Sequence, residues 1–215
     1  NSIQWMAQMS HQREISEFVQ RLKKLLSYNL GKEGRQTTLR MELEIVKEYI
    51  ALQQMRYDFI IEMNIEDGSY LDQPTVRMLF QPLVENAIRY GLGDDEKISI
   101  QVFEDVARHL AVVTISDSGK GLNQEEIDEI NQPFDYDWGY WKNENRGIGL
   151  RYVKAMLESF YDGQTSLFVN SKKGFGTRIT ILLPVRKPEE KKEKDKEVTL
   201  EENKVGQTDE SIDCR

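Results

Sequence analysis

Asp117 is a carboxylate at a position where strand periodicity predicts a buried side chain. It ends the run Ala111-Val-Val-Thr-Ile-Ser-Asp117, and strand alternation puts it on the same apolar side as Ile115. A buried charge without a partner is costly, so this carboxylate needs a hydrogen-bond donor. The exocyclic amino group of adenine is a donor of the required kind. The alternative is an ordinary turn aspartate that caps the glycine-rich loop behind it.

A second set of polar residues lies in the segment Gln81-Pro-Leu-Val-Glu-Asn-Ala-Ile-Arg-Tyr-Gly91, which we predict to be helical. On a helix, Asn86 and Arg89 share one face, as do Glu85 and Arg89. The amide oxygen of Asn86 suits Mg²⁺, which prefers oxygen ligands. Arg89 could meet a phosphate, and Glu85 could accept or orient a proton near it. The alternative is a Glu85–Arg89 surface pair, which the apolar flanking residues weaken because they predict a mostly buried helix.

Glycine pairs mark two further places where the backbone could approach a ligand closely. Gly119 and Gly121 follow the predicted strand that ends at Asp117. Gly147 and Gly149 open a predicted helix, whose free N–H groups would form an anion site at its positive end. The alternative for this second pair is a plain junction between a loop and a helix. The segment Gly174-Phe-Gly176-Thr177 is weaker evidence for a ligand site, because hairpin turns often have this composition.

In their order along the chain, the motifs are Gln81–Gly91, Asp117–Gly121 and Gly147–Leu150, and together they indicate a pocket for ATP and Mg²⁺. The sequence contains neither a P-loop nor a Rossmann fingerprint, so the pocket would be of another type. Residues 131–146 have no clean period and many aromatic side chains, which predicts a long functional loop between the second and third motifs.

Helical and strand periodicities alternate along the chain and predict the elements that carry these motifs. Predicted helices cover residues 1–30, 39–50, 74–90, a short stretch from 123, and 149–162. Predicted strands cover residues 57–65, 97–104, 109–116, 166–170 and 177–183. The second and third strands should be antiparallel neighbours, and the last two should form a hairpin. Asn123 and Glu126 have the spacing of a capping box.

The first two predicted helices each carry one apolar stripe that needs a partner. The stripes consist of Ile15, Phe18, Leu22, Leu25 and Leu26 in the first helix and of Leu39, Leu43, Val46 and Ile50 in the second. An intramolecular hairpin and a helical dimer interface explain this pattern equally well.

Composition limits the possible functions. The chain has 215 residues and a formal net charge of −8, which disfavours binding to nucleic acid through a broad basic face. Cys214 is the only cysteine, and His11 and His109 are the only histidines, so cysteine- or histidine-rich metal sites are excluded. No run is apolar and long enough to span a bilayer. Because the sequence begins with Asn1 rather than Met, we expect a fragment of a longer protein.

The ordered motifs together resemble the ATP-binding domain shared by sensor histidine kinases, Hsp90, gyrase B and MutL. Within that superfamily, Gln81–Gly91 and the preceding segment Thr38–Tyr57 look like the LytS/YesM-type bacterial sensor histidine kinases. Asn1-Ser-Ile is similar to the end of that family's phosphoacceptor motif, and the resemblance covers about residues 1–185. It implies an α/β fold, a two-layer sandwich of a mixed sheet with helices on one face, preceded by a helical dimerisation segment.

The resemblance also implies domains and residue roles. Residues 1–55 would be the helical segment, 56–186 the ATP-binding catalytic domain and 187–215 a charged disordered tail. Glu85 would take the catalytic acid/base position, and Asn86 would coordinate Mg²⁺. The remaining nucleotide contacts would be Arg89, Tyr90, Asp117, Gly119, Gly121, Gly147, Ile148, Gly149, Leu150 and Thr177. Residues 122–146 would form a lid, and Ser118 stands where the family commonly has asparagine.

The implied function is transfer of the ATP γ-phosphoryl group to a histidine, and then to an aspartate of a response regulator. The family's phosphoacceptor histidine would lie just upstream of Asn1, so this chain should bind ATP without phosphorylating itself. We expect His11 to be a solvated helix residue and His109 a strand residue without chemistry. The implied setting is the cytoplasmic part of a bacterial inner-membrane sensor that forms a homodimer.

Two alternatives come from other functional classes. The chain could be a nucleotide-binding regulatory module with little or no kinase activity. It could also be a serine kinase of the anti-sigma type, although that class lacks a helical front segment and an Asn1-Ser-Ile-like motif.

Overall fold

The computed structural model describes residues 13–31, 37–93, 97–131 and 148–185. Residues Asn1–Pro184 form one compact unit and Val185–Arg215 a second. The first unit is built on a five-stranded sheet with the order β2-β4-β5-β7-β6. The strands are β2 (Ile60–Ile65), β4 (Lys97–Asp105), β5 (Leu110–Asp117), β6 (Ser166–Ser171) and β7 (Thr177–Pro184). The sheet is mixed, because β2 pairs with β4 in parallel and the other neighbours are antiparallel.

One face of this sheet forms the core. Alternate residues of the three central strands are buried, and the register aligns them in rows such as Ile100, Ile115 and Ile179. The opposite face carries partly exposed side chains, including Phe103 and Phe168. This alternation is the pattern expected for an antiparallel sheet covered on one side.

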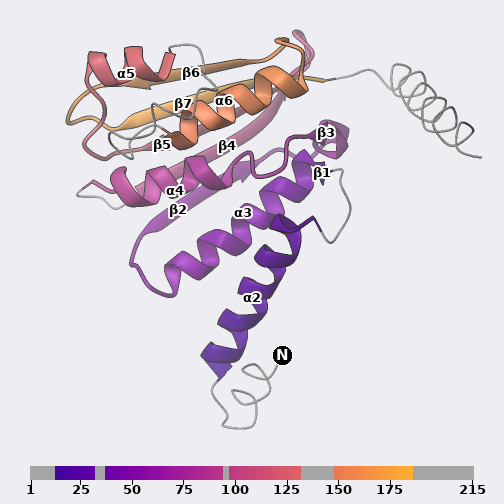
Figure 1. The fold of residues 1–215 in the computed structure, drawn as a ribbon, viewed down its shortest axis with the longest axis vertical. Coiled ribbons are helices and arrows are strands. Elements are labelled where there is room, and N and C mark those ends of the chain that lie inside the picture. Colours follow the sequence, from indigo (N-terminus) through magenta and orange to yellow (C-terminus); the bar gives the residue numbers. More distant parts are fainter. Residues whose placement is uncertain (1–12, 32–36, 94–96, 132–147, 186–215) are drawn as a thin grey trace, which may run out of the picture. The chain divides into compact units, whose positions relative to one another are not determined.

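Two helices, α4 (Gln81–Tyr90) and α6 (Ile148–Phe160), lie against the buried face of the sheet (Figure 1). Their apolar faces supply Leu83, Val84, Val153 and Leu157, all nearly inaccessible to solvent. A third helix, α5 (Gln124–Asn131), follows β5. The architecture is therefore the α/β sandwich with a mixed sheet and helices on one face that the sequence predicted.

The two front helices pack against each other as a hairpin. They are α2 (Arg13–Asn29) and α3 (Leu39–Gln54), joined by a small cluster of Leu25, Tyr28, Ile45 and Leu52. The predicted stripe of α3 is fully buried. Most of the predicted α2 stripe is not, because Ile15, Phe18, Leu22 and Leu26 remain 39–52% exposed. The contact with α2 uses other α3 residues, Ile45 and Leu52, so the hairpin does not explain the buried α3 stripe, and it leaves an apolar face exposed on α2.

The predicted helix from Pro74 to Tyr90 is wrong in its first half. A 3₁₀ turn η1 (Ser69–Asp72) and a short strand β3 (Pro74–Thr75) come first, and β3 pairs with β1 (Thr37–Thr38). Met78 then adopts a left-handed backbone with φ 60°. These long-range pairings override local helix propensity, so the helix begins only at Gln81, with a proline in its first turn.

Other local predictions are confirmed with small shifts. Asn123 and Glu126 form the reciprocal capping box, with N···O distances of 2.8 and 2.9 Å between each backbone nitrogen and the other residue's side-chain oxygen. The antiparallel pair β4–β5 and the hairpin β6–β7 are present. His109 is not a strand residue, since it occupies the turn before β5 with φ 54°. Strand β2 begins at Ile60 because the chain is still turning after α3.

Several expectations fall outside the described residues. They concern His11, Gly147, most of the lid segment and the charged tail. Among the helices that the structure describes, none has the length and hydropathy needed to cross a membrane.

Candidate functional site

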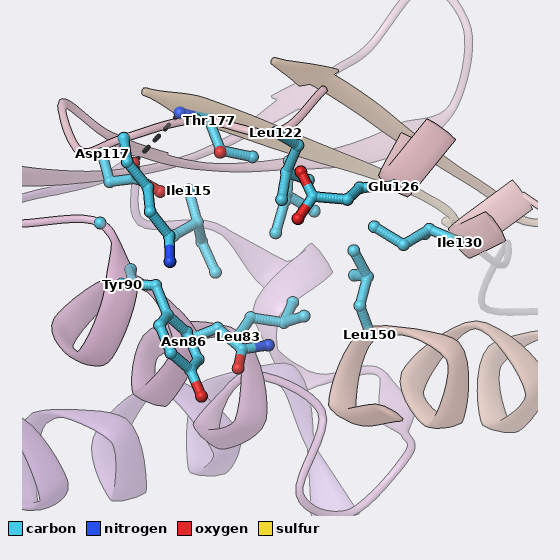
Figure 2. Close-up of a pocket in the computed structure, with 15 residues that line it drawn as sticks. Leu83, Asn86, Tyr90, Ile115, Asp117, Leu122, Glu126, Ile130, Leu150 and Thr177 are labelled. Atoms are coloured by element: carbon cyan, nitrogen blue, oxygen red, sulfur yellow. Dashed lines mark hydrogen bonds between the residues drawn. The ribbon is translucent and has the colours of Figure 1, made fainter. Parts of the chain in front are cut away.

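A pocket lies between the buried face of the sheet, helix α4 and the first turn of α6 (Figure 2). Six of the predicted site residues line it: Asn86, Tyr90, Asp117, Gly121, Leu150 and Thr177. They come from α4, the end of β5 and the loop after it, α6 and the start of β7, so segments separated by up to about 90 residues along the chain converge there. The sequence-derived motifs therefore meet at one site.

Asp117, the last residue of β5, is half-buried and lines the pocket. Its Oδ1 atom accepts hydrogen bonds from the backbone N–H groups of Gly119 and Thr177, each at 3.1 Å. The Thr177 contact is the dashed line in Figure 2. No donor among the described residues is bonded to Oδ2. Burial raises the pKa of this carboxyl, and the two N–H groups offset part of the rise. One carboxylate oxygen thus remains available to a ligand.

The Thr177 side chain is held in place by a hydrogen-bond network through Ser171. Its hydroxyl is 2.9 Å from Ser171 Oγ, which accepts the Leu122 N–H at 2.8 Å and donates to the Gly176 carbonyl at 2.8 Å. The Ser171 hydroxyl therefore ties the β6–β7 hairpin to the loop that follows Asp117. This arrangement fixes the Thr177 side chain on the pocket wall.

Glycines permit the close approach of three backbone segments around Asp117. A Cβ atom on Gly119 would lie 2.4 Å from Gly91 Cα, and one on Gly91 would lie 2.4 Å from Asp117 Cγ. The end of α4 therefore packs directly on the Asp117 loop. Gly121 has φ 63°, and its Cβ would lie 2.2 Å from the Lys172 carbonyl oxygen. Gly121 lines the pocket, whereas Gly119 does not.

Helix α4 contributes the polar wall of the pocket. Asn86 and Tyr90 are one helical turn apart and both face the cavity, with Leu83 beside them (Figure 2). The Lys120 ammonium lies 4.9 Å from the centre of the Tyr90 ring, a cation–π distance. Because Lys120 also lines the pocket, the site contains a cation next to the Asp117 loop.

The start of α6 approaches Asn86. A Cβ atom on Gly149 would lie 3.4 Å from Pro82 Cβ and 3.5 Å from the Asn86 amide nitrogen. Leu150 lines the pocket, and Ile148 is the first residue of the helix. The free N–H groups of the first turn of α6 therefore lie near Asn86, and such helix ends favour anions.

Glu85 and Arg89 lie on another side of α4. Both are exposed, neither lines the pocket, and no ion pair joins them in the described structure. Their charges instead act on Tyr49 of α3. The pKa of Tyr49 is raised to about 12, mainly by burial. The negative charge of Glu85 raises this pKa further, and the positive charge of Arg89 lowers it. The Arg89 guanidinium nevertheless lies 5.8 Å from the centre of the Tyr90 ring, so Arg89 borders the site without lining the pocket.

Sequence reasoning missed much of the pocket wall. The additional lining residues are Leu83, Ala87, Gly91, Ile115, Lys120, Leu122, Glu126, Ile130 and Ile179. Helical spacing from Asn86 could have identified Leu83 and Tyr90 together, and strand alternation from Asp117 identifies Ile115. Ile130 and Ile179 carry no local signal, because only the packing of α5 and β7 brings them to the site.

Comparison with known proteins agrees with this geometry. Residues 71–187 match the family model "Histidine kinase-, DNA gyrase B-, and HSP90-like ATPase". Residues 1–60 match the family model "Histidine kinase". The chain belongs to the histidine kinase-, DNA gyrase B- and HSP90-like ATPase family, and its ATP-binding catalytic domain is of the histidine kinase class.

Particular relatives are sensor kinases. The chain is 30% identical over 168 residues to "Sensor protein kinase HptS" of Staphylococcus aureus strain bovine RF122 / ET3-1. The match covers 78% of this chain and 32% of that protein, and HptS of strain USA300 gives the same values. This chain therefore spans about a third of the length of these relatives. The structure of the Acinetobacter baumannii histidine kinase AdeS shares the fold, with 16% identity, a TM-score of 0.50 and coverage of 85% and 84%.

The pocket fits the ligand that this family implies. It joins a carboxylate with a free oxygen, apolar walls for a flat ring, a lysine and the start of a helix. Within the described residues, no cluster of three or more His, Cys, Asp or Glu side chains could hold a metal alone. A cation here would need additional ligands, which is how Mg²⁺ usually binds beside phosphates.

Proposed function

We propose that this chain binds ATP with Mg²⁺ and transfers the γ-phosphoryl group to a histidine that lies upstream of Asn1. The observation that carries this proposal is the convergence of Asn86, Asp117 and Thr177 on one pocket. The phosphoryl group would then pass to an aspartate of a response regulator. The relatives are sensor protein kinases, which supports a kinase function, and they extend well beyond the chain.

The proposed binding mode uses both ends of the pocket. The free Oδ2 of Asp117 accepts the adenine amino group, and Ile115, Ala87 and Gly121 surround the ring. Asn86 offers an oxygen to Mg²⁺, while Lys120 and the first turn of α6 face the phosphates. When bound, the cation supplies charge neutralisation on the phosphates. Most of the rate enhancement then comes from positioning, as is general for phosphoryl transfer.

Glu85 and Arg89 have roles outside the adenine pocket in this proposal. Their exposure on α4 leaves both open to a second group that approaches from solvent. We assign Glu85 to proton transfer at the incoming histidine and Arg89 to the transferred phosphate. Tyr90 and Gly149 complete the nucleotide contacts, and Gly147 and Ile148 would extend them on the phosphate side.

The finer classification rests on sequence resemblance. We propose that the chain is of the LytS/YesM type, because Thr38–Tyr57 and Gln81–Gly91 match that family's pattern. We also propose that the domain boundaries lie near 55 and 186, and that the chain is the cytoplasmic part of a membrane sensor. Its exposed α2 stripe supports a homodimer built on the front helices.

Calorimetric titration tests the pocket first. Wild-type chain should bind ATP, more tightly with Mg²⁺ than without it. Asp117→Asn should weaken binding by about 1.5–3 kcal/mol, the range for a hydrogen bond to a charged group. This corresponds to a roughly ten- to hundredfold rise in Kd. Unchanged affinity in a folded Asp117→Asn variant would contradict the role assigned to Asp117.

Phosphoryl transfer distinguishes the kinase from a nucleotide-binding regulatory module. Incubation with labelled ATP should leave this chain unphosphorylated, and acid-labile phosphate should appear on an added chain that carries the upstream histidine. Glu85→Gln should reduce this transfer without a matching loss of ATP affinity. Tight ATP binding with no transfer to the added chain would favour the regulatory module.

A further inference from the structure

The end of helix α2 is attached to the start of helix α4 through a buried carboxylate. Glu42 of α3 is 1% exposed, and Tyr28 of α2 is fully buried. The Tyr28 hydroxyl donates a hydrogen bond to Glu42 Oε1 and is 2.5 Å from Thr37 Oγ1. Burial, followed by the Glu42 carboxylate, raises the pKa of Tyr28, so the hydroxyl keeps the proton that it donates.

The Glu42 carboxylate also holds the backbone that leads into α4. Its Oε1 accepts the Met78 N–H at 2.8 Å, and its Oε2 accepts the Leu79 N–H at 2.7 Å. The N-cap residue of α4, Phe80, makes no side-chain capping bond. A carboxylate from another helix thus takes the place of a local cap, and its negative charge suits the positive end of α4.

Backbone conformation agrees with this role. Met78 has a left-handed backbone, an unfavourable state for a residue with a side chain unless its surroundings hold it. The turn at Met78 points two successive N–H groups at one carboxylate. Without Glu42, the buried Leu79 N–H and the part-buried Met78 N–H would both lose their partner, and the turn would lose the interactions that hold it.

Two further contacts fasten α2 to the same place. The Arg77 guanidinium stacks over the Tyr28 ring at 4.4 Å and donates to the Tyr28 carbonyl oxygen at 2.6 Å. The Asn29 amide lies 3.5 Å from Gln81 Oε1, at the first residue of α4. Figure 1 shows α2 ending near β1 and the start of α3.

We propose that Tyr28 and Glu42 are positioning residues of the nucleotide site, which couple the last turn of α2 to α4 and so to Asn86 and Tyr90. The inference rests on the proposed ATP-binding function. Helix α4 carries four residues that line the pocket, Leu83, Asn86, Ala87 and Tyr90, and its N-cap residue makes no side-chain capping bond. Loosening the start of α4 therefore reduces the fraction of chains whose pocket can bind the nucleotide. A displacement of the last turn of α2 would change the pocket through the same contacts, from Tyr28 to Glu42 and on to the start of α4.

The test compares Tyr28→Phe and Glu42→Gln with a matched buried tyrosine. Tyr70→Phe is the control, because the Tyr70 hydroxyl also bonds inside the protein, to the carbonyls of Glu66 and Val102. ATP affinity is measured by calorimetry, and hydrogen exchange is measured without ligand at residues 83–90. These amides bond to neither Tyr28 nor Glu42, so their exchange reports the helix rather than the lost bond.

Tyr28→Phe and Glu42→Gln should each weaken ATP binding by roughly tenfold and speed exchange across residues 83–90. The double variant should lose less than the sum, because both changes break one network. Tyr70→Phe should lower stability without either effect. Unchanged affinity and exchange in folded Tyr28→Phe and Glu42→Gln, or equal effects in Tyr70→Phe, would overturn the inference. If the wild type binds no ATP, the proposed function fails, and exchange in α4 alone decides whether the coupling exists.

Discussion

At the residue scale, the pocket contains side chains whose hydrogen-bonding or charged groups are not fully used by the protein itself. Asp117 uses one oxygen for the backbone of Gly119 and Thr177 and keeps the other free. Lys120 is exposed and lies over the Tyr90 ring. Asp117 therefore favours a ligand with a hydrogen-bond donor, and Lys120 adds positive charge to a site proposed for a polyanion.

Lys120→Met should separate the contribution of the lysine charge to phosphate binding from the contribution of the pocket to adenine binding. Loss of one exposed charge should weaken ATP binding by about two- to fivefold, the scale of exposed ion pairs. Binding of uncharged adenosine should not change. Calorimetry with both ligands measures this, and the ATP effect should shrink in high salt because the charge is screened. An equal loss for adenosine would mean that Lys120 acts on the ring rather than on the phosphates.

At the element scale, helix α2 uses its two faces differently. Leu25 and Tyr28 pack inward on α3, whereas Phe18 and Leu22 remain exposed on the predicted stripe. An apolar helix stripe of this kind usually marks an interaction surface. The proposed homodimer would bury it against the same stripe of a second copy.

Sedimentation equilibrium of the wild-type chain should therefore show a concentration-dependent dimer. Leu22→Glu should shift the chain to monomer, because a charge would be buried at the centre of the stripe. Val106→Glu, at a highly exposed position after β4, serves as the control and should not affect association. A wild-type chain that stays monomeric at all concentrations would contradict the proposed dimer.

At the scale of the whole molecule, the buried carboxylate of Glu42 links stability to pH. Burial raises its pKa above the ordinary value of 4.5, and hydrogen bonds from Tyr28 and the Met78 and Leu79 backbone offset part of this rise. Between 4.5 and the raised value, the folded chain keeps a proton that the unfolded chain has released. The free energy of unfolding therefore falls as pH rises through that window.

Glu42→Gln should remove this contribution. The wild-type free energy of unfolding minus that of the variant should decrease as pH rises from about 4.5, with a slope of at most about 1.4 kcal/mol per pH unit. Urea unfolding at a series of pH values measures the difference. Asp117, whose pKa is also raised by burial, contributes equally to both chains and cancels. A pH-independent difference would mean that Glu42 titrates normally.

Local sequence predicted most elements of this protein and the polar centre of its site. Strand alternation placed Asp117 beside Ile115, the capping-box spacing predicted the start of α5, and the motif order indicated a nucleotide pocket. These predictions depend on neighbours within a few residues, where side-chain periodicity and turn chemistry determine the structure. The same local reasoning extended α4 back to Pro74, because it contains no information on pairing with Thr37 and Thr38.

Tertiary structure decided the features that depend on distant contacts. It brought Ile130 and Ile179 to the pocket wall and left Glu85 and Arg89 exposed outside the pocket lining. It also buried Glu42 against the backbone that precedes α4. A glutamate in an amphipathic helix predicts a solvated side chain, and only packing between three separated segments makes it a cap. Local propensity differs by fractions of a kcal/mol per residue, so such long-range hydrogen bonds and burial decide the outcome.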